Sequence, residues 1–325
     1  MMLLIRRSLL GLMLLLVSHG GAQASDELIN DELKALIDAA DIDPSMPLPQ
    51  QVAQWNHYFE QNGFILVTVE VTAEGSLAVI PGHITKVVIE GMSPKNEAHA
   101  REIIRNSLAS SVTEHTLDRA LALINDMSGV NASFALERLD DRSFELFVSA
   151  SEQWQHGIIS LENTPGHLGE EYKATFSQNF NGLILGGDIL RLQGAWVVGD
   201  DDPSQTSIMG SYQLPVGSDG AYLEVGAGDF RSETEVHGRA TAYTTMFGTV
   251  IVPGTVSTQD FEGRNYYVTA GYPVLRSHDE SLYVLGQIDY SEDETENIGK
   301  STVTHGDVGF FYSHASPDGQ SFELG

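Results

Sequence analysis

The spacing of apolar residues changes near residue 155. Before this point, apolar residues at helical spacing alternate with short β-branched runs, and after it nearly every segment alternates apolar and polar residues with a period of two. From residue 156 onward we identify eight such segments of about 8–14 residues. The pattern predicts a small α+β module followed by a long antiparallel sheet.

Two segments illustrate the alternation. In 187–198 the apolar side consists of Leu190, Leu192, Trp196 and Val198, and the polar side includes Arg191 and Gln193. In 281–290 the apolar side consists of Leu282, Val284, Ile288 and Tyr290, and the polar side includes Gln287 and Asp289. Because successive side chains of a strand point to opposite faces, these segments suit a wall between lipid and water. A soluble β-sandwich would alternate in the same way.

The predicted connections differ in length on the two sides of this sheet. The short ones are 180–186, 215–220, 275–281 and 316–320, and those on the other side are 165–169, 199–205, 231–262 and 291–301. Two of the second group are long and most are acidic, an asymmetry typical of outer-membrane barrels. Aromatic residues near the predicted strand ends fit interfacial girdles: Trp154, Tyr172, Tyr212, Tyr272 and Tyr312.

The module before residue 155 has two parts. In the first, residues 26–40 have helical apolar spacing, prolines come next, a second helix ends at Gly63, and strands are expected at 64–71 and 77–80. The second part, 83–150, predicts the order strand, helix, helix, strand, strand. Ser93-Pro94 and Thr113 have the residue types of helix starts. Two helices on one face of three strands give this unit a core of its own.

The first 24 residues have the layout of a secretory signal peptide. Arg6 and Arg7 precede an apolar run of about ten residues, which is shorter than the roughly 20 that a spanning helix needs. Ala22-Gln23-Ala24 is a small-x-small cleavage motif, so the mature chain is expected to begin at Ser25. The sequence therefore predicts an exported protein.

Composition excludes several classes of function. The chain has no cysteine, which excludes disulfides, thiol catalysis and cysteine-ligated zinc. It carries 17 basic and 45 acidic residues, a net charge of −28, and such a field repels nucleic acid. The eleven histidines are scattered and none is expected to form a close ligand pair with a carboxylate, so we predict no metal site and no cofactor. No catalytic constellation is recognisable, and we expect no enzyme activity.

The unit at 83–150 resembles a POTRA (polypeptide-transport-associated) domain. The resemblance includes "HITKVVIEG", two helices, and "LINDMSGVNASFALER" leading into "FELFVSASE". The segment after this unit resembles the barrel of two-partner secretion translocators of the haemolysin secretion/activation type, through "LENTPGHLGEEYKATFSQNFNGLILGGDILRL", "SYQLPVGSDGAYLEV" and "AGYPVLRSHDESLYV". Each motif alone is weakly specific, whereas their order after a POTRA-like unit and a signal peptide is more so.

The resemblance implies a function and a location. Members of the family lie in the outer membrane with an N-terminal module in the periplasm, and each exports one large exoprotein without nucleotide. The POTRA domains bind the unfolded client and the barrel conducts it, so the implied partners are an unfolded polypeptide and outer-membrane lipid. An exposed strand edge can pair with an extended client, which fits this role. The alternatives are an outer-membrane assembly factor of the same superfamily and a passive porin-like barrel.

Three departures from the family pattern shape the predicted domains: the family has two POTRA domains, its barrel has more strands than the roughly eight expected here, and the chain stops at 321–325 as another strand begins. We expect a signal peptide at 1–24, an incomplete first POTRA-like domain or a helix plus linker at 25–82, a POTRA domain at 83–152, and the N-terminal half of a barrel at 153–325. The helix at 26–40 has a second interpretation as a plug helix, which we favour less because only a short linker precedes the next helix. The family implies about sixteen strands, so we expect either a fragment or a truncated gene product.

Six residues are candidates for functional sites. For client binding we choose Glu137 and Arg138, on the predicted strand 132–139 of the POTRA-like unit. For the pore wall we choose the polar residues of two alternating segments, namely Arg191, Gln193, Gln287 and Asp289. All six would also be ordinary as solvent-facing strand residues, and a one-residue slip of register would reverse the pore assignment.

Overall fold

The chain forms two compact units. The computed structural model describes residues 26–43, 45–109, 112–140, 142–165, 170–199, 205–236, 241–245, 248–252, 257–295, 298–315 and 321–324. The first unit comprises the described residues up to Glu90, with Ala100–Ile124 and Ala132–Ser149. The second comprises Gly91–His99, Asn125–Asn131 and the described residues from Ala150 onward. The predicted signal peptide at 1–24 lies outside the described residues.

The first part of unit 1 is built from two helices and a two-stranded sheet. Its elements are α2 (Asp26–Ala39), α3 (Leu48–Gln61), β1 (Val67–Val71) and β2 (Leu77–Pro81), and β1 pairs with β2 in antiparallel register. Leu33, Phe59 and Val69 are buried together, so α2 contributes to the same core as α3 and the sheet. Gly63 ends α3 as expected: it has φ +78°, and the amide of Phe64 donates to the carbonyl of Phe59 at 2.9 Å.

The segment from His83 to Glu152 has the predicted strand, helix, helix, strand, strand order, and parts of it belong to each unit. Its elements are β3 (His83–Glu90), α4 (Pro94–Ser107), α5 (Glu114–Asn125), β4 (Val130–Arg138) and β5 (Ser143–Glu152). The sheet order is β3-β5-β4, and β3 runs parallel to β5, which requires the crossover that the two helices supply. Leu146 and Val148 of β5 are buried, as are Ile103 of α4 and Ile124 of α5. Thr113 caps α5, because its hydroxyl accepts from the amide of Thr116 at 3.2 Å.

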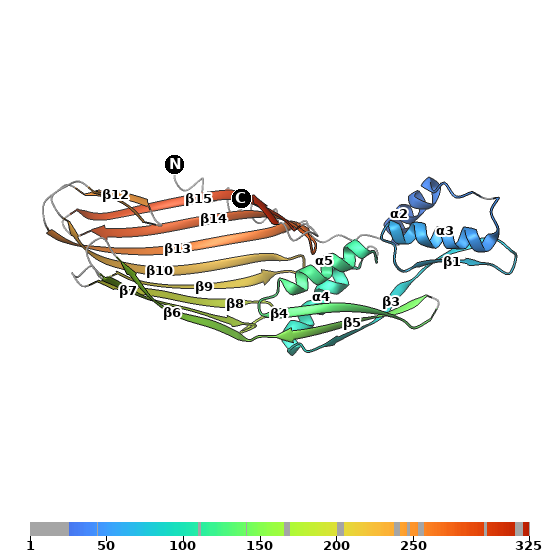
Figure 1. The fold of residues 1–325 in the computed structure, drawn as a ribbon, viewed down its shortest axis with the longest axis horizontal. Coiled ribbons are helices and arrows are strands. Elements are labelled where there is room, and N and C mark those ends of the chain that lie inside the picture. Colours follow the sequence, from blue (N-terminus) through green and yellow to red (C-terminus); the bar gives the residue numbers. More distant parts are fainter. Residues whose placement is uncertain are drawn as a thin grey trace. The chain divides into compact units, whose positions relative to one another are not determined.

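Unit 2 is dominated by one antiparallel sheet of nine described strands (Figure 1). The strands are β6 (Gln155–Pro165), β7 (Glu170–Asn181), β8 (Ile189–Gly199), β9 (Gln205–Val216), β10 (Ala221–Val236), β13 (Ser257–Arg276), β14 (Glu280–Thr295), β15 (Gly299–Ala315) and the short β16 (Ser321–Leu324). Each pairs with its neighbour in sequence, except that a separate hairpin lies between β10 and β13, formed by β11 (Thr241–Thr245) and β12 (Gly248–Val252). Within the described residues the sheet is open, with β6 and β16 at its edges. The predicted fold class is confirmed.

Two predicted loops are wrong in extent. The segment 231–262 was expected to be a single loop, yet β10 continues to Val236, β13 begins at Ser257, and the hairpin of β11 and β12 lies between them. The segment 291–301 is also mostly strand, because β14 continues to Thr295 and β15 begins at Gly299. Charged side chains do not interrupt a backbone ladder, so a change from apolar to acidic residues did not mark the end of pairing. Parts of the predicted connections at 165–169, 199–205 and 316–320 lie outside the described residues.

No helix of the described part of the chain is both long and apolar enough to cross a membrane.

The buried ring of Phe59 supports the first core and offers a test of it. Phe59→Ala should lower the free energy of unfolding of this part by about 3–5 kcal/mol, because it removes a fully buried ring and leaves a cavity. Trp55 stacks on Phe59 with ring centroids 5.5 Å apart, so its fluorescence reports this core. We would titrate the full chain with urea in a background with Trp154→Phe and Trp196→Phe. The exposed neighbour change Glu60→Ala is the control, and equal midpoints for the two variants would contradict the assigned core.

Candidate functional site

The register of the sheet assigns each strand residue to one of two faces. Arg191 opposes Ser211, which opposes Gly226, which opposes Tyr267, which opposes Asp289. Directly opposed residues of antiparallel strands point to the same side, so Arg191 and Asp289 share a face. Gln193 and Gln287 each lie two residues from one of them and therefore share it as well. We call this the polar face. The structure thus places all four predicted pore residues on one side.

The opposite side, here called the apolar face, presents large hydrophobic side chains to the exterior. The exposed members of this set are Ile159, Leu161, Tyr172, Leu192, Trp196, Ile208, Val225, Tyr266, Val268, Tyr272, Ile288, Tyr290, Val308 and Phe310. A contiguous exposed apolar surface of this extent marks an interaction surface. Three apolar side chains, Ile158, Met209 and Val303, are exposed on the polar face. Most exposed apolar side chains of the sheet, but not all, therefore lie on the apolar face.

The apolar face has a defined height. On β14 it runs from Leu282 to Tyr290, and the eight residue steps correspond to roughly 26 Å along the strand at about 3.3 Å each. A strand tilt of about 40° reduces this to roughly 20 Å, close to the ~25 Å apolar band of outer-membrane barrels. Tyr172, Tyr212, Tyr272 and Tyr312 of the predicted girdles all belong to this face by register.

Charged residues replace apolar ones where this band ends. On β13 and β14 the next positions beyond Tyr266 and Tyr290 are Arg264 and Glu292. Here Arg264 pairs with Asp229 at 3.6 Å, Arg231 pairs with Asp229 at 3.3 Å and with Glu262 at 3.8 Å, and Lys300 pairs with Glu292. Apart from Glu292, these side chains are largely exposed, so the ion pairs contribute little to stability. They mark the boundary of the apolar band.

On the polar face, Arg191 lies in a network of hydrogen bonds. Its guanidinium contacts Glu224 Oε2 at 3.1 Å and Gln213 Oε1 at 2.9 Å, and the hydroxyl of Tyr267 donates to Glu224 Oε1 at 2.9 Å. The positive charge of Arg191 is thus balanced on the wall itself. A cavity of about 260 Å³ opens beside this network, lined by Arg191, Gln193, Met209, Ser211, Glu224 and Tyr267.

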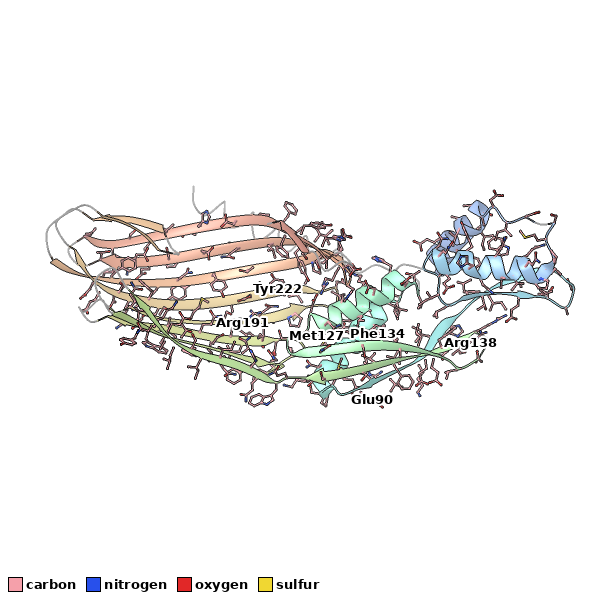
Figure 2. The ribbon with its side chains drawn as sticks, viewed as in Figure 1. Glu90, Met127, Phe134, Arg138, Arg191 and Tyr222 are labelled. Atoms are coloured by element: carbon pink, nitrogen blue, oxygen red, sulfur yellow. The ribbon has the colours of Figure 1, made fainter. Side chains whose placement is uncertain are left out.

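The rings of two tyrosines on the polar face lie close to glycines of the neighbouring strand. A Cβ added to Gly226 would meet the ring of Tyr267 at 2.3 Å, and one added to Gly271 would meet the ring of Tyr222 at 2.3 Å. A side chain at either position would displace the ring. Arg191 and Tyr222 are labelled in Figure 2. The wall that results is polar and closely packed.

The turn between β7 and β8 is organised by Asp188. Its carboxylate accepts from the amides of Leu183 at 2.6 Å, Ile184 at 2.8 Å and Leu185 at 2.8 Å, and from the hydroxyl of Tyr212. Burial raises the pKa of Asp188, but the hydrogen bonds from Leu185, Tyr212, Ile184 and Leu183 outweigh it and hold the pKa below its ordinary value of 3.8. The stabilisation is therefore present above pH 4 and is lost as pH falls through the depressed pKa.

Side chains from the start of α4 bind the same turn within unit 2. Lys95 Nζ donates to the carbonyls of Gly182 at 3.1 Å and Leu183 at 2.6 Å. Asn96 accepts from the amide of Gly187 at 2.9 Å and donates to Glu152 at 2.9 Å. The β7–β8 turn is thus held from two sides, by its own aspartate and by the residues at the start of α4.

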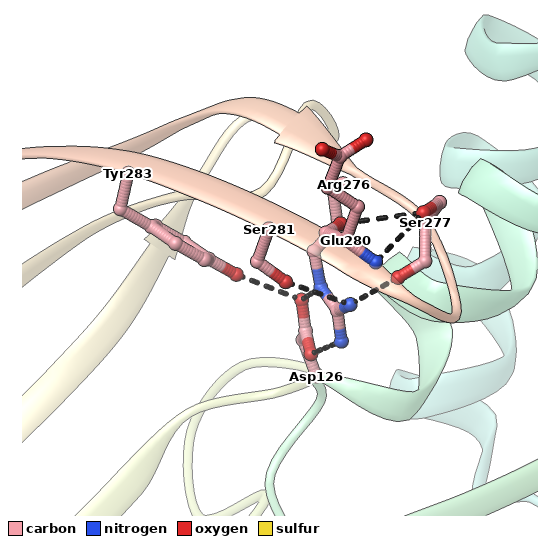
Figure 3. A network of polar contacts seen from close by, with 6 residues as sticks. All are labelled: Asp126, Arg276, Ser277, Glu280, Ser281 and Tyr283. Carbon is pink, nitrogen blue, oxygen red and sulfur yellow. Dashed lines mark hydrogen bonds and ion pairs between the residues drawn. The ribbon is translucent and has the colours of Figure 1, made fainter. Parts of the chain in front are cut away.

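The turn between β13 and β14 is held by an arginine–aspartate pair (Figure 3). Arg276 Nε and an Nη donate to the two carboxylate oxygens of Asp126 at 2.7 and 2.5 Å, and Tyr283 donates to Asp126 at 3.1 Å. The same guanidinium donates to Ser281 Oγ at 3.2 Å. Bidentate pairs of this kind fix orientation as well as distance, so the segment Asn125–Asn131 has a defined position on this turn.

Glu137 and Arg138 belong to unit 1 and lie exposed at the end of β4. They are neighbours on a strand and so point to opposite faces of the small sheet. Arg138 Nε donates to the carbonyl of Asp140 at 3.0 Å. Their predicted role in client binding remains a prediction, as does pore lining by the other four residues.

Several residues that shape these sites were not predicted. The expectation that no histidine pairs closely with a carboxylate is wrong for His305, whose Nδ1 lies 2.9 Å from Asp307. The spacing His-x-Asp within an alternating strand places both side chains on one face, and this signal was available in the sequence. The Asp126–Arg276 pair had no comparable signal, because its two residues are 150 positions apart in the chain. Asp188 lies within five residues of the three amides that it binds, and only its partner Tyr212 is distant.

Comparison with solved structures identifies the fold. CdiB from Acinetobacter baumannii matches with a TM-score of 0.63 and 16% identity, over 92% of this chain and 57% of that one. CdiB from Escherichia coli matches with a TM-score of 0.59 and 11% identity, over 92% and 55%. The chain has the fold of these two CdiB structures. The predicted resemblance is confirmed at the level of the fold.

The extent of the match is also informative. The chain spans a little over half the length of the two CdiB structures. A structure of BamA from Haemophilus ducreyi lacking POTRA domains 1-3 aligns at a TM-score of 0.43 and 14% identity, over 89% of this chain and 57% of that one. No protein-family model matches the sequence, and no curated protein matches it.

Asp188→Asn tests the role of the carboxylate in its turn. The amide cannot accept all four hydrogen bonds, and unsatisfied donors cost about 1–3 kcal/mol. Hydrogen–deuterium exchange of the amides of Leu183, Ile184 and Leu185 at pH 7 should be roughly 5- to 150-fold faster, because about 1.4 kcal/mol corresponds to a factor of ten. The exposed Asp279→Asn, in the β13–β14 turn, should leave these rates unchanged. Unchanged rates in Asp188→Asn would show that the carboxylate does not hold the turn.

Proposed function

We propose that this protein is an outer-membrane translocator that passes an unfolded exoprotein from the periplasm to the cell surface. One observation carries the proposal. The antiparallel sheet has an exposed apolar face and a polar face, in a chain whose POTRA-plus-barrel fold matches CdiB over 92% of its length. The apolar face suits outer-membrane lipid, and the polar face suits the wall of an aqueous pore.

The chemistry of the polar face supports passage of a polypeptide. Arg191 is balanced by Glu224, so a client does not meet a concentrated fixed charge at this position. Gln193, Gln287 and Asp289 extend the polar surface across β8 and β14. An extended chain that lacks stable structure can exchange hydrogen bonds with such a wall and with water. Because the wall exposes little apolar surface, such a chain would not bind to it tightly through hydrophobic contacts.

The proposed client-binding surface is the outer side of β4. The sheet order β3-β5-β4 leaves β4 at an edge of the described sheet, and a strand edge can pair with an extended segment. Glu137 and Arg138 flank this edge near its end and present opposite charges. We infer that they select clients through charge, while the backbone pairing supplies sequence-independent affinity.

The proposed lipid contact predicts that a cation on the apolar face is costly. Val268→Arg places a charge in the middle of the apolar band of β13 and should destabilise the inserted state by about 2–4 kcal/mol. We expect a marked loss of protein from the outer-membrane fraction, quantified by immunoblot against total protein. Thr269→Arg on the polar face is the matched control and should remain inserted. Equal amounts of the two variants in the membrane would mean that this face does not contact lipid.

Export itself is tested in the source bacterium by replacing the gene with variants and comparing surface and supernatant proteins by mass spectrometry. Removing the protein, or deleting residues 83–150, should abolish one or a few large exported proteins. Unchanged export would favour a passive porin, and a general loss of outer-membrane barrels would favour an assembly factor.

The charge reversal Glu137→Lys with Arg138→Glu tests the client surface without deleting the domain. It should lower export several-fold while the protein stays at its normal level in the outer membrane. The matched control reverses an exposed pair on α4, with Glu102→Lys and Arg105→Glu, whose side chains lie 3.7 Å apart. Equal export by both double variants would mean that Glu137 and Arg138 do not contact the client. The proposal that the protein is a translocator would then depend on the result of the deletion experiment.

A further inference from the structure

Three potential metal ligands converge on the polar face, from β14 and β15. Asp289, His305 and Asp307 each place a ligand atom within 4.8 Å of the other two. Asp289 and His305 are direct cross-strand partners, and Asp307 lies two residues beyond His305. The backbone ladder therefore brings these side chains together. None of them belongs to the network around Arg191.

The ligand types define the chemistry of the ion. One imidazole nitrogen with two carboxylate oxygens suits borderline divalent cations such as zinc, whereas calcium and magnesium prefer oxygen alone. Zinc–ligand bonds of about 2.0–2.1 Å place tetrahedral ligands roughly 3.4 Å apart, so small rotations of these side chains suffice. His305 and Asp307 are largely exposed, so a fourth position is open to water or to a passing side chain.

The charge of the cluster also points to a cation. The carboxylates of Asp289 and Asp307 each place an oxygen within 4.8 Å of the other, and neither pairs with a lysine or arginine of the described residues. By contrast, Glu224 contacts Arg191 on the same face, and Glu292 contacts Lys300 on the same two strands. Two carboxylates held close together repel each other, and a bound divalent cation would remove that repulsion.

Neighbouring residues already orient one of the three ligands. The amide of Gln287 donates to both carboxylate oxygens of Asp289 at 2.9 Å, and Thr269 donates to the amide oxygen of Gln287 at 3.2 Å. Residues that orient a metal ligand in this way raise the affinity of a site. Gln287 therefore acts as a positioning residue for Asp289.

We propose that Asp289, His305 and Asp307 bind one divalent cation of the zinc class on the polar face of the sheet. The ion joins β14 to β15 and adds a fixed positive charge to a wall that is otherwise balanced or acidic at this position. This proposal does not depend on the proposed export function, because the three ligands can bind a cation in the absence of a client.

The test measures zinc binding to the purified full chain in detergent micelles. After treatment with a chelator and its removal, the protein is titrated with zinc chloride by calorimetry, and cobalt(II) is added separately to record its visible absorption. The wild-type protein should bind one more zinc ion than His305→Gln and should show a cobalt spectrum that this variant lacks. His314→Gln changes a histidine of the same strand on the opposite face and should behave as wild type.

Two further variants keep the result decisive. Asp289→Asn preserves side-chain volume and should also lose the ion, and circular dichroism confirms that each variant retains its sheet. Gln287→Ala should keep the stoichiometry with roughly tenfold weaker affinity, as expected when a ligand loses its orienting partner. The assignment is overturned if His305→Gln and Asp289→Asn bind as much zinc as wild type, or if the wild-type protein binds none.

Discussion

The antiparallel register of the long sheet is the constraint on which the other features of unit 2 depend. A shift of one residue in any pair would exchange the polar and apolar faces of that strand. Several local features hold the register in place. Tyr267 lies over Gly226, Tyr222 lies over Gly271, and Arg191 reaches across two strand pairs to Glu224. These contacts form only when the strands are in the observed register. The side-chain contacts of the polar face therefore stabilise the register, and the register in turn brings those side chains together.

The sequence was sufficient to predict those elements whose signals are local. The helix starts at Pro94 and Glu114, the end of α3 at Gly63, and the alternation in β8 and β14 all depend on residues within a few positions of one another. Alternation also placed Arg191, Gln193, Gln287 and Asp289 on one side, because a period of two is preserved along any strand. The same signals predicted an α+β module followed by a long antiparallel sheet, whereas the POTRA domain and the barrel were implied by the family resemblance.

The features that could not be predicted depend on partners that are distant in sequence. Asp126 and Arg276 are separated by 150 residues, and a hydrogen-bonded pair of this kind leaves no periodic pattern in either segment. The lengths of the strands beyond the apolar band were underestimated for a different reason. Pairing continues wherever backbone groups can bond, and acidic side chains such as Glu292 remain compatible with it as long as they face water.

The two ends of the sheet are stabilised by different kinds of polar interaction. At the short turns, Asp188 and Asp126 lie in networks with several donors each and are partly shielded from water, so charge-assisted hydrogen bonds retain much of their strength there. At the other end, the ion pairs of Arg231 and Arg264 are largely exposed and contribute little. Local opening should therefore begin among the long charged strand ends and stop at the short turns.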